Sequence, residues 1–303
     1  MNDQISIEPL VSIIMSVFNE EKYVADAIES ILNQTYQNWE FIIINDGSID
    51  GTESIINQYQ DHRIRYFYQE NMGLTKSLNK GIALSQGKYI ARIDADDRSL
   101  PTRIEQQVNF LENNITFVLI GSYYYNVDIS TMILSISKPV ISDKNCRKKL
   151  MFGKTHFLHS SVMFKKEING EIMRYDETFK HAQDARMWIH LATKGQIGIL
   201  PEILVVALTK RPSSITINRN NFERLKSSLR YSFIAFQEFK VSMLTFPIAV
   251  VIIFLKRIAS LIVSTGISPY YYQLRKFIEN KNYINISSSD IPNLWNGKKE
   301  SKL

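Results

Sequence analysis

The chain is predicted to fold as an α/β domain around a mainly parallel, doubly wound sheet, because two patterns recur in its first third. Short β-branched segments alternate with segments of helical periodicity, the arrangement typical of such sheets. Polar clusters follow the apolar segments at residues 16–20, 45–48 and 94–97. Ligands of doubly wound sheets bind beyond the carboxyl ends of the strands, so these clusters predict the position of a site.

Four strands and four helices are expected in this first third. The strands cover residues 11–17, 39–46, 64–68 and 88–94. The helices place apolar residues three or four positions apart, as at Leu74, Leu78 and Ile82. Pro101 stands where the fourth helix begins, a position that tolerates its missing N–H.

The segment from 116 to 216 is less regular and is expected to extend the same sheet. Strands are predicted at residues 117–125, 160–166, 197–200 and 203–208, the last two on either side of Pro201. A helix is predicted to begin near His181 and to end at Gly195.

The tail differs from the rest of the chain in composition. Residues 241–255 are uncharged and apolar, Lys256 and Arg257 follow, and residues 258–263 are apolar again. The uninterrupted run is shorter than the ~20 residues of a spanning helix. We therefore expect a helix lying on a membrane surface, with the basic pair among the headgroups. A helix buried against the preceding domain is the alternative.

Composition narrows the function classes. Hydrophobic residues make up 45% of the chain, enough for a sizeable core. The single cysteine, Cys146, permits no disulfide framework, and the N-terminus lacks the features of a signal peptide, so a cytoplasmic location is expected. The net charge is +6, but no nucleic-acid-binding motif accompanies it, so no nucleic-acid partner is expected.

The cluster Asp94-Ala95-Asp96-Asp97 is the sharpest chemical feature. Grouped carboxylates repel one another unless a cation is present, and an extended chain would direct Asp94 and Asp96 to the same side. Carboxylate oxygens suit Mg²⁺ or Mn²⁺, which would hold a diphosphate as it leaves. The alternative is an acidic cluster stabilised by the dipole of the next helix.

The order of three motifs resembles glycosyltransferase family 2, the inverting enzymes of the GT-A fold. The motifs are VSIIMSVFNEEKYVADAIESILNQTY from Val11, FIIINDGSIDGT from Phe41, and NMGLTKSLNKGIALSQGKYIARIDADD from Asn71. The strong resemblance covers residues 10–112 and weaker matches reach 216. It implies a GT-A sandwich with a nucleotide-sugar-binding half (10–115) and an acceptor-binding half (116–218), to which the composition of the tail adds a helical, membrane-associated extension (219–303).

The resemblance also assigns the donor site residue by residue. It implies a divalent cation held by Asp96. It places the base beside the first motif, with Asp46 accepting a hydrogen bond from a uracil-type ring. The ribose and diphosphate lie along the third motif, and Asp97 positions the donor sugar. The implied nucleotide-sugar contacts are Ser16, Phe18, Asn19, Glu20, Asp46, Asn71, Gly73, Lys76, Asp94, Ala95 and Asp97.

Asp184 matches the catalytic base of the family, at the start of the predicted helix 181–194. An inverting transfer needs one carboxylate to take the proton of the attacking hydroxyl, which contributes ~10²–10⁴-fold to the rate. The alternative role is an N-cap aspartate. Trp188 stands where the family carries an aromatic residue, and His156 and His159 are either structural or acceptor contacts.

Three departures from the family pattern refine the prediction. Asn45 replaces the first aspartate of the usual Asp-Asp-Gly-Ser. Arg211 replaces a histidine, so no third protein ligand to the metal is expected, and Arg211 or Lys210 would bind the diphosphate. Met187 replaces the tryptophan of the polymerising members, which indicates addition of a single sugar.

The predicted function is inverting transfer of a hexosyl or N-acetylhexosaminyl group from a UDP-type sugar donor. The acceptor is a hydroxyl of a saccharide or lipid-linked saccharide in cell-surface polysaccharide synthesis, on the inner face of the cell membrane. The alternative is a catalytically inactive, membrane-associated scaffold that binds a nucleotide-sugar. A nucleotidyltransferase or dehydrogenase is disfavoured, because no glycine-rich loop follows the first predicted strand.

Overall fold

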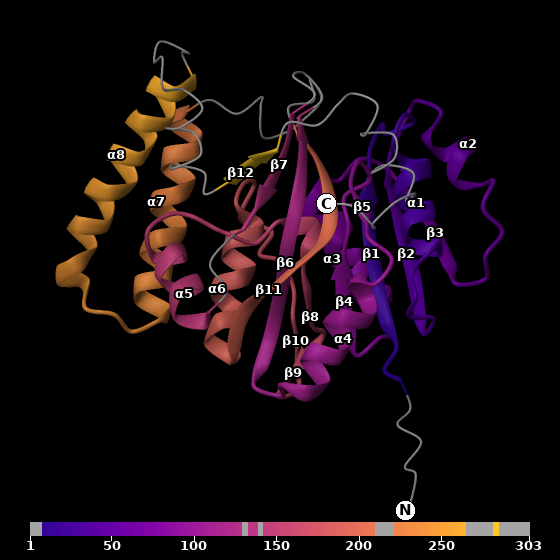
Figure 1. Ribbon diagram of the computed structural model, residues 1–303, viewed down its shortest axis with the longest axis horizontal. Coiled ribbons are helices and arrows are strands. Elements are labelled where there is room, and N and C mark those ends of the chain that lie inside the picture. The colour runs from indigo at the N-terminus through magenta and orange to yellow at the C-terminus, as the bar shows by residue number, and fades with distance from the viewer. Residues whose placement is uncertain (1–7, 129–132, 139–141, 210–220, 265–280, 285–303) are drawn as a thin grey trace, which may run out of the picture.

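The computed structural model describes residues 8–128, 133–138, 142–209, 221–264 and 281–284, which form a ten-stranded mixed sheet covered by helices (Figure 1). Its strand order is β12-β7-β6-β8-β4-β1-β2-β3, with β11 paired to β6 and β5. The two halves predicted from the sequence therefore share one sheet.

The first half follows the predicted alternation. Strands β1 (Val11–Val17), β2 (Trp39–Asp46), β3 (Ile64–Gln69) and β4 (Tyr89–Arg92) pair in parallel with one another, in the order β4-β1-β2-β3. They alternate with α1 (Val24–Leu32), α2 (Thr52–Ile56) and α3 (Leu74–Leu84). A Cβ on Gly81 would lie 2.6 Å from Ile14 Cγ2, so glycine lets α3 pack closely on β1.

The segment after β4 makes the sheet mixed. It contains β5 (Arg98–Ser99), α4 (Arg103–Asn113), β6 (Phe117–Asp128), β7 (Ile133–Ser137), α5 (Asp143–Met151), β8 (Met163–Lys165), α6 (Gln183–Lys194) and β11 (Gln196–Thr209). Strand β8 is antiparallel to both β4 and β6. The two predicted strands around Pro201 are one strand, β11, with register shifts near that residue. A short ribbon, β9 (Glu167–Ile168) and β10 (Glu171–Ile172), stands apart.

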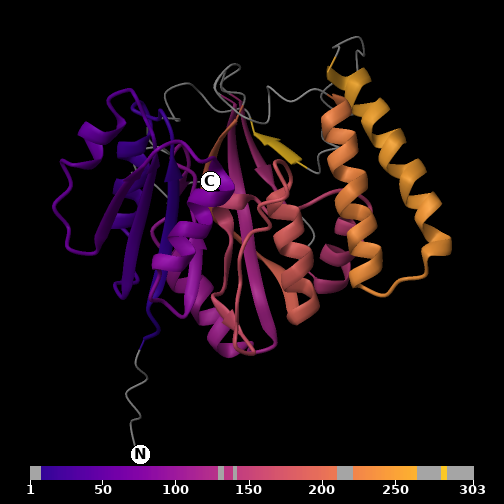
Figure 2. The same ribbon diagram turned by 180° about the vertical axis from the view of Figure 1, so that it is seen from behind.

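The tail begins with a helical hairpin, α7 (Asn221–Glu238) and α8 (Phe246–Ser264), at the end of the molecule opposite α2 and β3 (Figures 1 and 2). Among the described residues, no helix is long and apolar enough to cross a membrane. Strand β12 (Lys281–Ile284) then pairs with β7, so the tail also contributes to the sheet, which the sequence did not predict.

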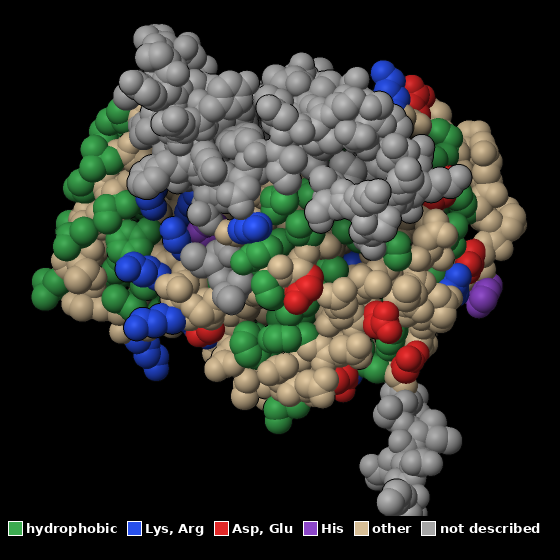
Figure 3. All heavy atoms as spheres, viewed as in Figure 1, with side chains coloured by type: hydrophobic (Ala, Val, Ile, Leu, Met, Phe, Trp, Pro, Cys, Tyr) green, Lys and Arg blue, Asp and Glu red, His purple; other side chains and the backbone are tan. Residues whose placement is uncertain are grey.

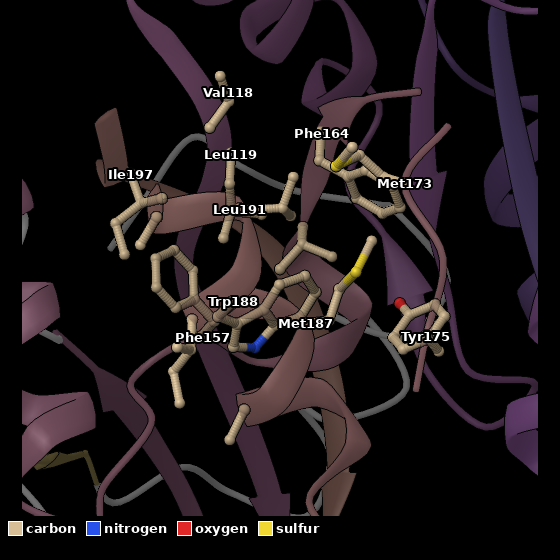
Figure 4. Close-up of a cluster of buried hydrophobic side chains, with 14 of the residues drawn as sticks. Val118, Leu119, Phe157, Phe164, Met173, Tyr175, Met187, Trp188, Leu191 and Ile197 are labelled. Atoms are coloured by element: carbon tan, nitrogen blue, oxygen red, sulfur yellow. The ribbon is translucent and has the colours of Figure 1, made fainter. Parts of the chain in front are cut away.

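Buried apolar side chains form a core on each face of the sheet. Alternation along β1 divides its residues, because Ile13 and Met15 join α1 and α4 in one core, whereas Ile14 joins α3 and α6 in the other. Trp188 of α6 is 0% exposed and lies at the centre of the second core, between Phe157 and Tyr175 (Figure 4). Its ring therefore belongs to the core and does not face solvent.

Candidate functional site

The loops after β1 and β2 are joined by hydrogen bonds, so the first two polar clusters meet. Asn19 donates its backbone N–H to Ser48 Oγ (3.0 Å) and accepts from the backbone N–H of Ile49 through Oδ1 (2.8 Å). The backbone N–H of Glu20 donates to Thr52 Oγ1 (2.8 Å). Asn19 has a positive φ of 54°, which asparagine tolerates better than most residues. Asn19 is therefore placed to hold both loops together.

Asp46 is 3% exposed and accepts three hydrogen bonds at the end of β2. Oδ1 accepts from Gln69 Nε2 (2.7 Å) and the backbone N–H of Met72 (2.9 Å), and Oδ2 accepts from the backbone N–H of Gly73 (2.9 Å). The carboxylate thus fixes the loop before α3. Its predicted hydrogen bond to a nucleotide base stays a prediction.

Asn45, which replaces an aspartate of the family pattern, is fully buried and hydrogen-bonded. Its Nδ2 donates to Tyr66 Oη (2.9 Å), and its Oδ1 accepts from the backbone N–H of Ser48 (2.9 Å). An amide can donate to the tyrosine oxygen and accept from the turn at once, which a carboxylate cannot. The replacement therefore suits this site.

Several predicted donor contacts are open to solvent around this loop. Phe18 is 45% exposed, Asn71 and Lys76 are exposed, and Ser16 is half-buried. Met72, which the sequence did not single out, is 53% exposed beside them in sequence. These exposed side chains next to the fixed loops are accessible to a ligand.

The third cluster lies in a turn, not in an extended strand as expected. Strand β4 ends at Arg92, and the backbone N–H of Asp97 donates to the Asp94 carbonyl (3.2 Å). This turn, and not the alternation of a strand, brings Asp94, Asp96 and Asp97 together, with one ligand oxygen of each within 4.8 Å of the others. Ala95 is 4% exposed and anchors the turn in the core.

Arg92 compensates part of the negative charge of Asp94, Asp96 and Asp97. It is 1% exposed at the end of β4 and forms an ion pair with Asp94, which also accepts a hydrogen bond from Ser160 Oγ (3.0 Å). Burial alone would raise the pKa of Asp94, but the charge and hydrogen bond of Arg92 lower it to about 2. Asp94 is therefore a firmly ionised carboxylate.

The remaining two carboxylates fit a hard cation. Burial, followed by the charges of Asp96 and Asp94, raises the pKa of Asp97 well above its ordinary value. A divalent cation would relieve this repulsion, and the donor atoms are all the carboxylate oxygens that Mg²⁺ and Mn²⁺ prefer. Asp96 and Asp97 are thus the residues that would hold it.

A second arginine, Arg103 of α4, forms hydrogen bonds to the backbone at the end of β4 and just before β8. It is 0% exposed, and its Nη2 donates to the carbonyls of Arg92 (2.8 Å) and Val162 (3.1 Å). Burial and the neighbouring charge of Arg92 lower its pKa to about 9. The end of β4 is therefore held to the segment that leads into β8.

Asp184 lies in the first turn of α6 on the acceptor side. Ala182, with a φ of 59°, occupies the N-cap position, so Asp184 is not the capping residue of this helix. Burial and the charges of Asp184 and Asp94 raise the pKa of Tyr175, against the effect of Arg92. Both aspartates therefore act electrostatically on one tyrosine, and the role of Asp184 as the base stays a prediction.

His159 lies in the segment that contacts both Tyr175 and the acidic turn. Its Nε2 shares a hydrogen bond with Tyr175 Oη (2.7 Å), and the next residue, Ser160, donates to Asp94. Burial, followed by the charge of Arg92, lowers the pKa of His159 well below its ordinary value. A neutral imidazole thus lies between the acidic turn and the acceptor side.

The family profile described as Glycosyl transferase family 2 matches residues 12–173. The chain belongs to this family. An uncharacterized glycosyltransferase of Methanocaldococcus jannaschii is 37% identical over 75% of this chain and 78% of its own length. A putative teichuronic acid biosynthesis glycosyltransferase, TuaG of Bacillus subtilis, is 32% identical over 62% of this chain and 74% of its own. Among curated relatives, the matched share of the relative's length ranges from 27% to 78%.

Solved structures confirm the GT-A architecture of this family 2 glycosyltransferase. S. aureus TarS 1-349 in complex with UDP-GlcNAc superposes with a TM-score of 0.61, at 16% identity, over 88% of this chain and 80% of its own. The mannosyltransferase PcManGT of Pyrobaculum calidifontis, in complex with GDP-Man and Mn²⁺, gives 0.58 at 15% identity, over 97% and 89%. At these identities the likeness concerns the fold alone.

Other predicted residues of the family 2 glycosyltransferase lie elsewhere. His156 is surrounded by basic side chains, and burial followed by Lys154, Lys149 and Lys256 lowers its pKa to about 3. Arg211 and Lys210 lie outside the described residues. Arg92, Arg103 and Ser160 were missed, and the only available signal was an arginine inside a buried strand directly before the acidic turn.

Proposed function

We propose that the protein transfers one hexosyl or N-acetylhexosaminyl group from a nucleoside diphosphate sugar, with UDP as the expected nucleotide, to an acceptor hydroxyl with inversion. The acceptor is a saccharide or lipid-linked saccharide of cell-surface polysaccharide synthesis. The reaction takes place at the cytoplasmic face of the membrane. The enzyme depends on Mg²⁺ or Mn²⁺.

The observation that carries the proposal is the acidic turn at the end of β4, with Asp184 nearby. Three carboxylates have oxygens within 4.8 Å of one another, and one is neutralised by a buried arginine. The charges of Asp94 and Asp184 both act on Tyr175, which supports the proposal that the turn and the predicted base work together. A scaffold would not need this arrangement.

The residues have distinct roles in the proposed reaction. A bound Mg²⁺ or Mn²⁺ would stabilise the negative charge of the leaving diphosphate. Asp184 takes the proton of the acceptor hydroxyl while its oxygen bonds to the anomeric carbon. The bond between that carbon and the diphosphate oxygen breaks on the opposite face. Asp97 and the loop held by Asp46 orient the donor.

The relatives support the choice of substrates. TuaG is named for teichuronic acid biosynthesis, which is a polysaccharide pathway. TarS was solved with UDP-GlcNAc, and PcManGT with GDP-Man and Mn²⁺, so this fold accommodates both nucleotides. We propose UDP because the motif containing Asp46 resembles that of uracil-binding members.

Calorimetric titration of the protein with UDP and with GDP, each with and without Mn²⁺, tests the donor site. We expect metal-dependent UDP binding that Asp96→Asn weakens at least about tenfold, the effect of about 1.4 kcal/mol of lost binding energy. Asp184→Asn is the matched control, because it changes a carboxylate outside the acidic turn and should bind UDP as wild type does.

Turnover separates an enzyme from a scaffold. With a UDP-sugar and a lipid-linked acceptor, release of UDP should fall about 10²–10⁴-fold in Asp184→Asn. Nucleotide binding without turnover in the wild type, over a panel of donors and acceptors, would favour the scaffold. A folded protein that binds no nucleotide with either metal would contradict both.

A further inference from the structure

Helix α8 presents a continuous apolar stripe to solvent. Val251, Leu255 and Ile258 repeat at intervals of four and three residues, which places them on one face of the helix. Leu244 and Ile248 continue the pattern towards the α7–α8 turn, and Phe254 lies beside it. Their exposed fractions run from 40% for Ile258 to 88% for Leu244. Isolated exposed apolar residues are ordinary, but a contiguous stripe marks an interaction surface.

The opposite face of α8 is fixed to the protein. Ala249 and Ile253 are 0% and 2% exposed. Phe246 stacks edge-on against Phe233 and Phe236 of α7, with ring centroids 5.4 Å apart in both pairs. The stripe therefore cannot turn inwards without separating the hairpin, and only one side of the helix is available to a partner.

Basic side chains gather next to the stripe, and acidic residues are absent from this stretch of sequence. No Asp or Glu occurs between Glu238 and Glu279. After burial, the charges of Lys154, Lys149 and Lys256 all lower the pKa of His156, and the charge of Lys149 also lowers the pKa of Lys256 on α8. Figure 3 shows the hydrophobic side chains along the flank formed by α8 and the Lys and Arg side chains beside them.

A groove at the base of the hairpin adds to this positive charge. It encloses about 670 Å³ and is lined by the C-terminal end of α7 together with α5 and α6. Lys144, Arg147, Lys194 and Lys240 contribute four cations to its wall, against the single acidic side chain of Glu238. Arg147 and Lys194 have acidic partners, Asp143 and Glu171, whereas no ion pair involves Lys144 or Lys240 within the described residues.

We propose that the outer face of α8 docks on an anionic lipid bilayer. The apolar stripe enters the boundary between headgroups and acyl chains, and the basic side chains beside it and in the groove contact the lipid phosphates. The positive charge of this face favours an anionic bilayer over a second copy of the chain. Two copies would bring their lysines together without acidic residues to pair with them. This docking rests on the proposed function, which puts the reaction at the membrane, but vesicle binding is measured without donor or acceptor and so is judged separately from transfer.

Flotation of the full chain with vesicles tests the proposal. The vesicles are phosphatidylcholine alone, or phosphatidylcholine with phosphatidylglycerol. We expect binding to the anionic vesicles that weakens with added salt. Val251→Glu/Leu255→Glu should reduce it by at least about tenfold, and Lys149→Glu/Lys256→Glu by about fivefold or more per charge.

Ile115→Glu is the matched control, because Ile115 is 78% exposed but lies between α4 and β6, away from the hairpin. It should bind vesicles as wild type does, and circular dichroism should show all variants folded. Equal binding by Val251→Glu/Leu255→Glu would overturn the insertion of the stripe. Absence of vesicle binding, with a dimer in light scattering that this double substitution dissociates, would assign the face to a second copy instead.

Discussion

The two partners of the ion pair between Arg92 and Asp94 differ in solvent exposure, so we expect their substitutions to differ in their effect on stability. Arg92 is 1% exposed on its side chain, whereas Asp94 is 37% exposed. Removing Asp94 leaves a buried guanidinium with its counter-ion gone. Removing Arg92 leaves a carboxylate that water can still reach. Asp94→Ala should therefore destabilise the protein more than Arg92→Met does.

The magnitudes follow from burial. Removing one partner of a buried ion pair costs about 3–5 kcal/mol. Asp97 also acts electrostatically on Arg92, so we expect the lower end, about 3 kcal/mol, for Asp94→Ala. Water screens the carboxylate that Arg92→Met leaves behind, so that change should cost about 1 kcal/mol.

Urea unfolding followed by circular dichroism measures both costs, and the double variant completes a mutant cycle. We expect Arg92→Met/Asp94→Ala to be nearly as stable as Arg92→Met alone, with a coupling energy of about 3 kcal/mol. Additive effects, or a cost below about 1 kcal/mol for Asp94→Ala, would refute the reasoning. Activity lost in Asp94 variants must accordingly be compared at equal folded fraction, which is why Asp96 is the better test of the donor site.

Three further predictions concern the loops and the pH response. Gly47 has a φ of +81°, and a Cβ there would lie 2.8 Å from the backbone N of Asn71, so Gly47→Ala should cost about 1–3 kcal/mol and weaken UDP binding in calorimetry. Gly170→Ala, with a φ of +80° and open space, should leave UDP binding intact. The pKa of Asp94 is about 2, below the ordinary 3.8, so its contribution to stability is complete above about pH 4 and is lost towards pH 2; acid unfolding should be less steep in Asp94→Ala. Asn79 holds the segment before α6 through hydrogen bonds of 2.8 and 3.0 Å, so Asn79→Ala should lower turnover about tenfold at unchanged UDP affinity.

The sequence predicted the elements that local patterns determine. The strands of the first half are short β-branched runs between amphipathic segments, and β1 to β4 lie where that alternation places them. The motif order also identified the family correctly. The carboxylates of Asp94, Asp96 and Asp97 were found together, although the assumed reason, an extended chain, was wrong, since a turn brings them together.

What the sequence did not reveal depends on contacts between distant segments. Ser160 is 66 residues from Asp94, and Arg103 reaches the Val162 carbonyl over 59 residues. No periodicity encodes such pairs, because a buried arginine has the same sequence signature whichever carbonyl it meets. Strand β12 was missed for a similar reason, since four residues pair with β7 only because the fold brings that edge near.

Because of these distant contacts, the three carboxylates of the acidic turn have different roles. Arg92 and Ser160 occupy both oxygens of Asp94, so this carboxylate is already compensated before any ligand arrives. Hydrogen bonds from Ser160 and from the backbone N–H of Leu208 lower the pKa of Asp97, but burial and the charges of Asp96 and Asp94 outweigh them, so its pKa stays raised. A bound cation would relieve the repulsion that raises the pKa of Asp97. We therefore expect Asp96 and Asp97 to bind the cation, while the ion pair of Asp94 with Arg92 holds the turn in place.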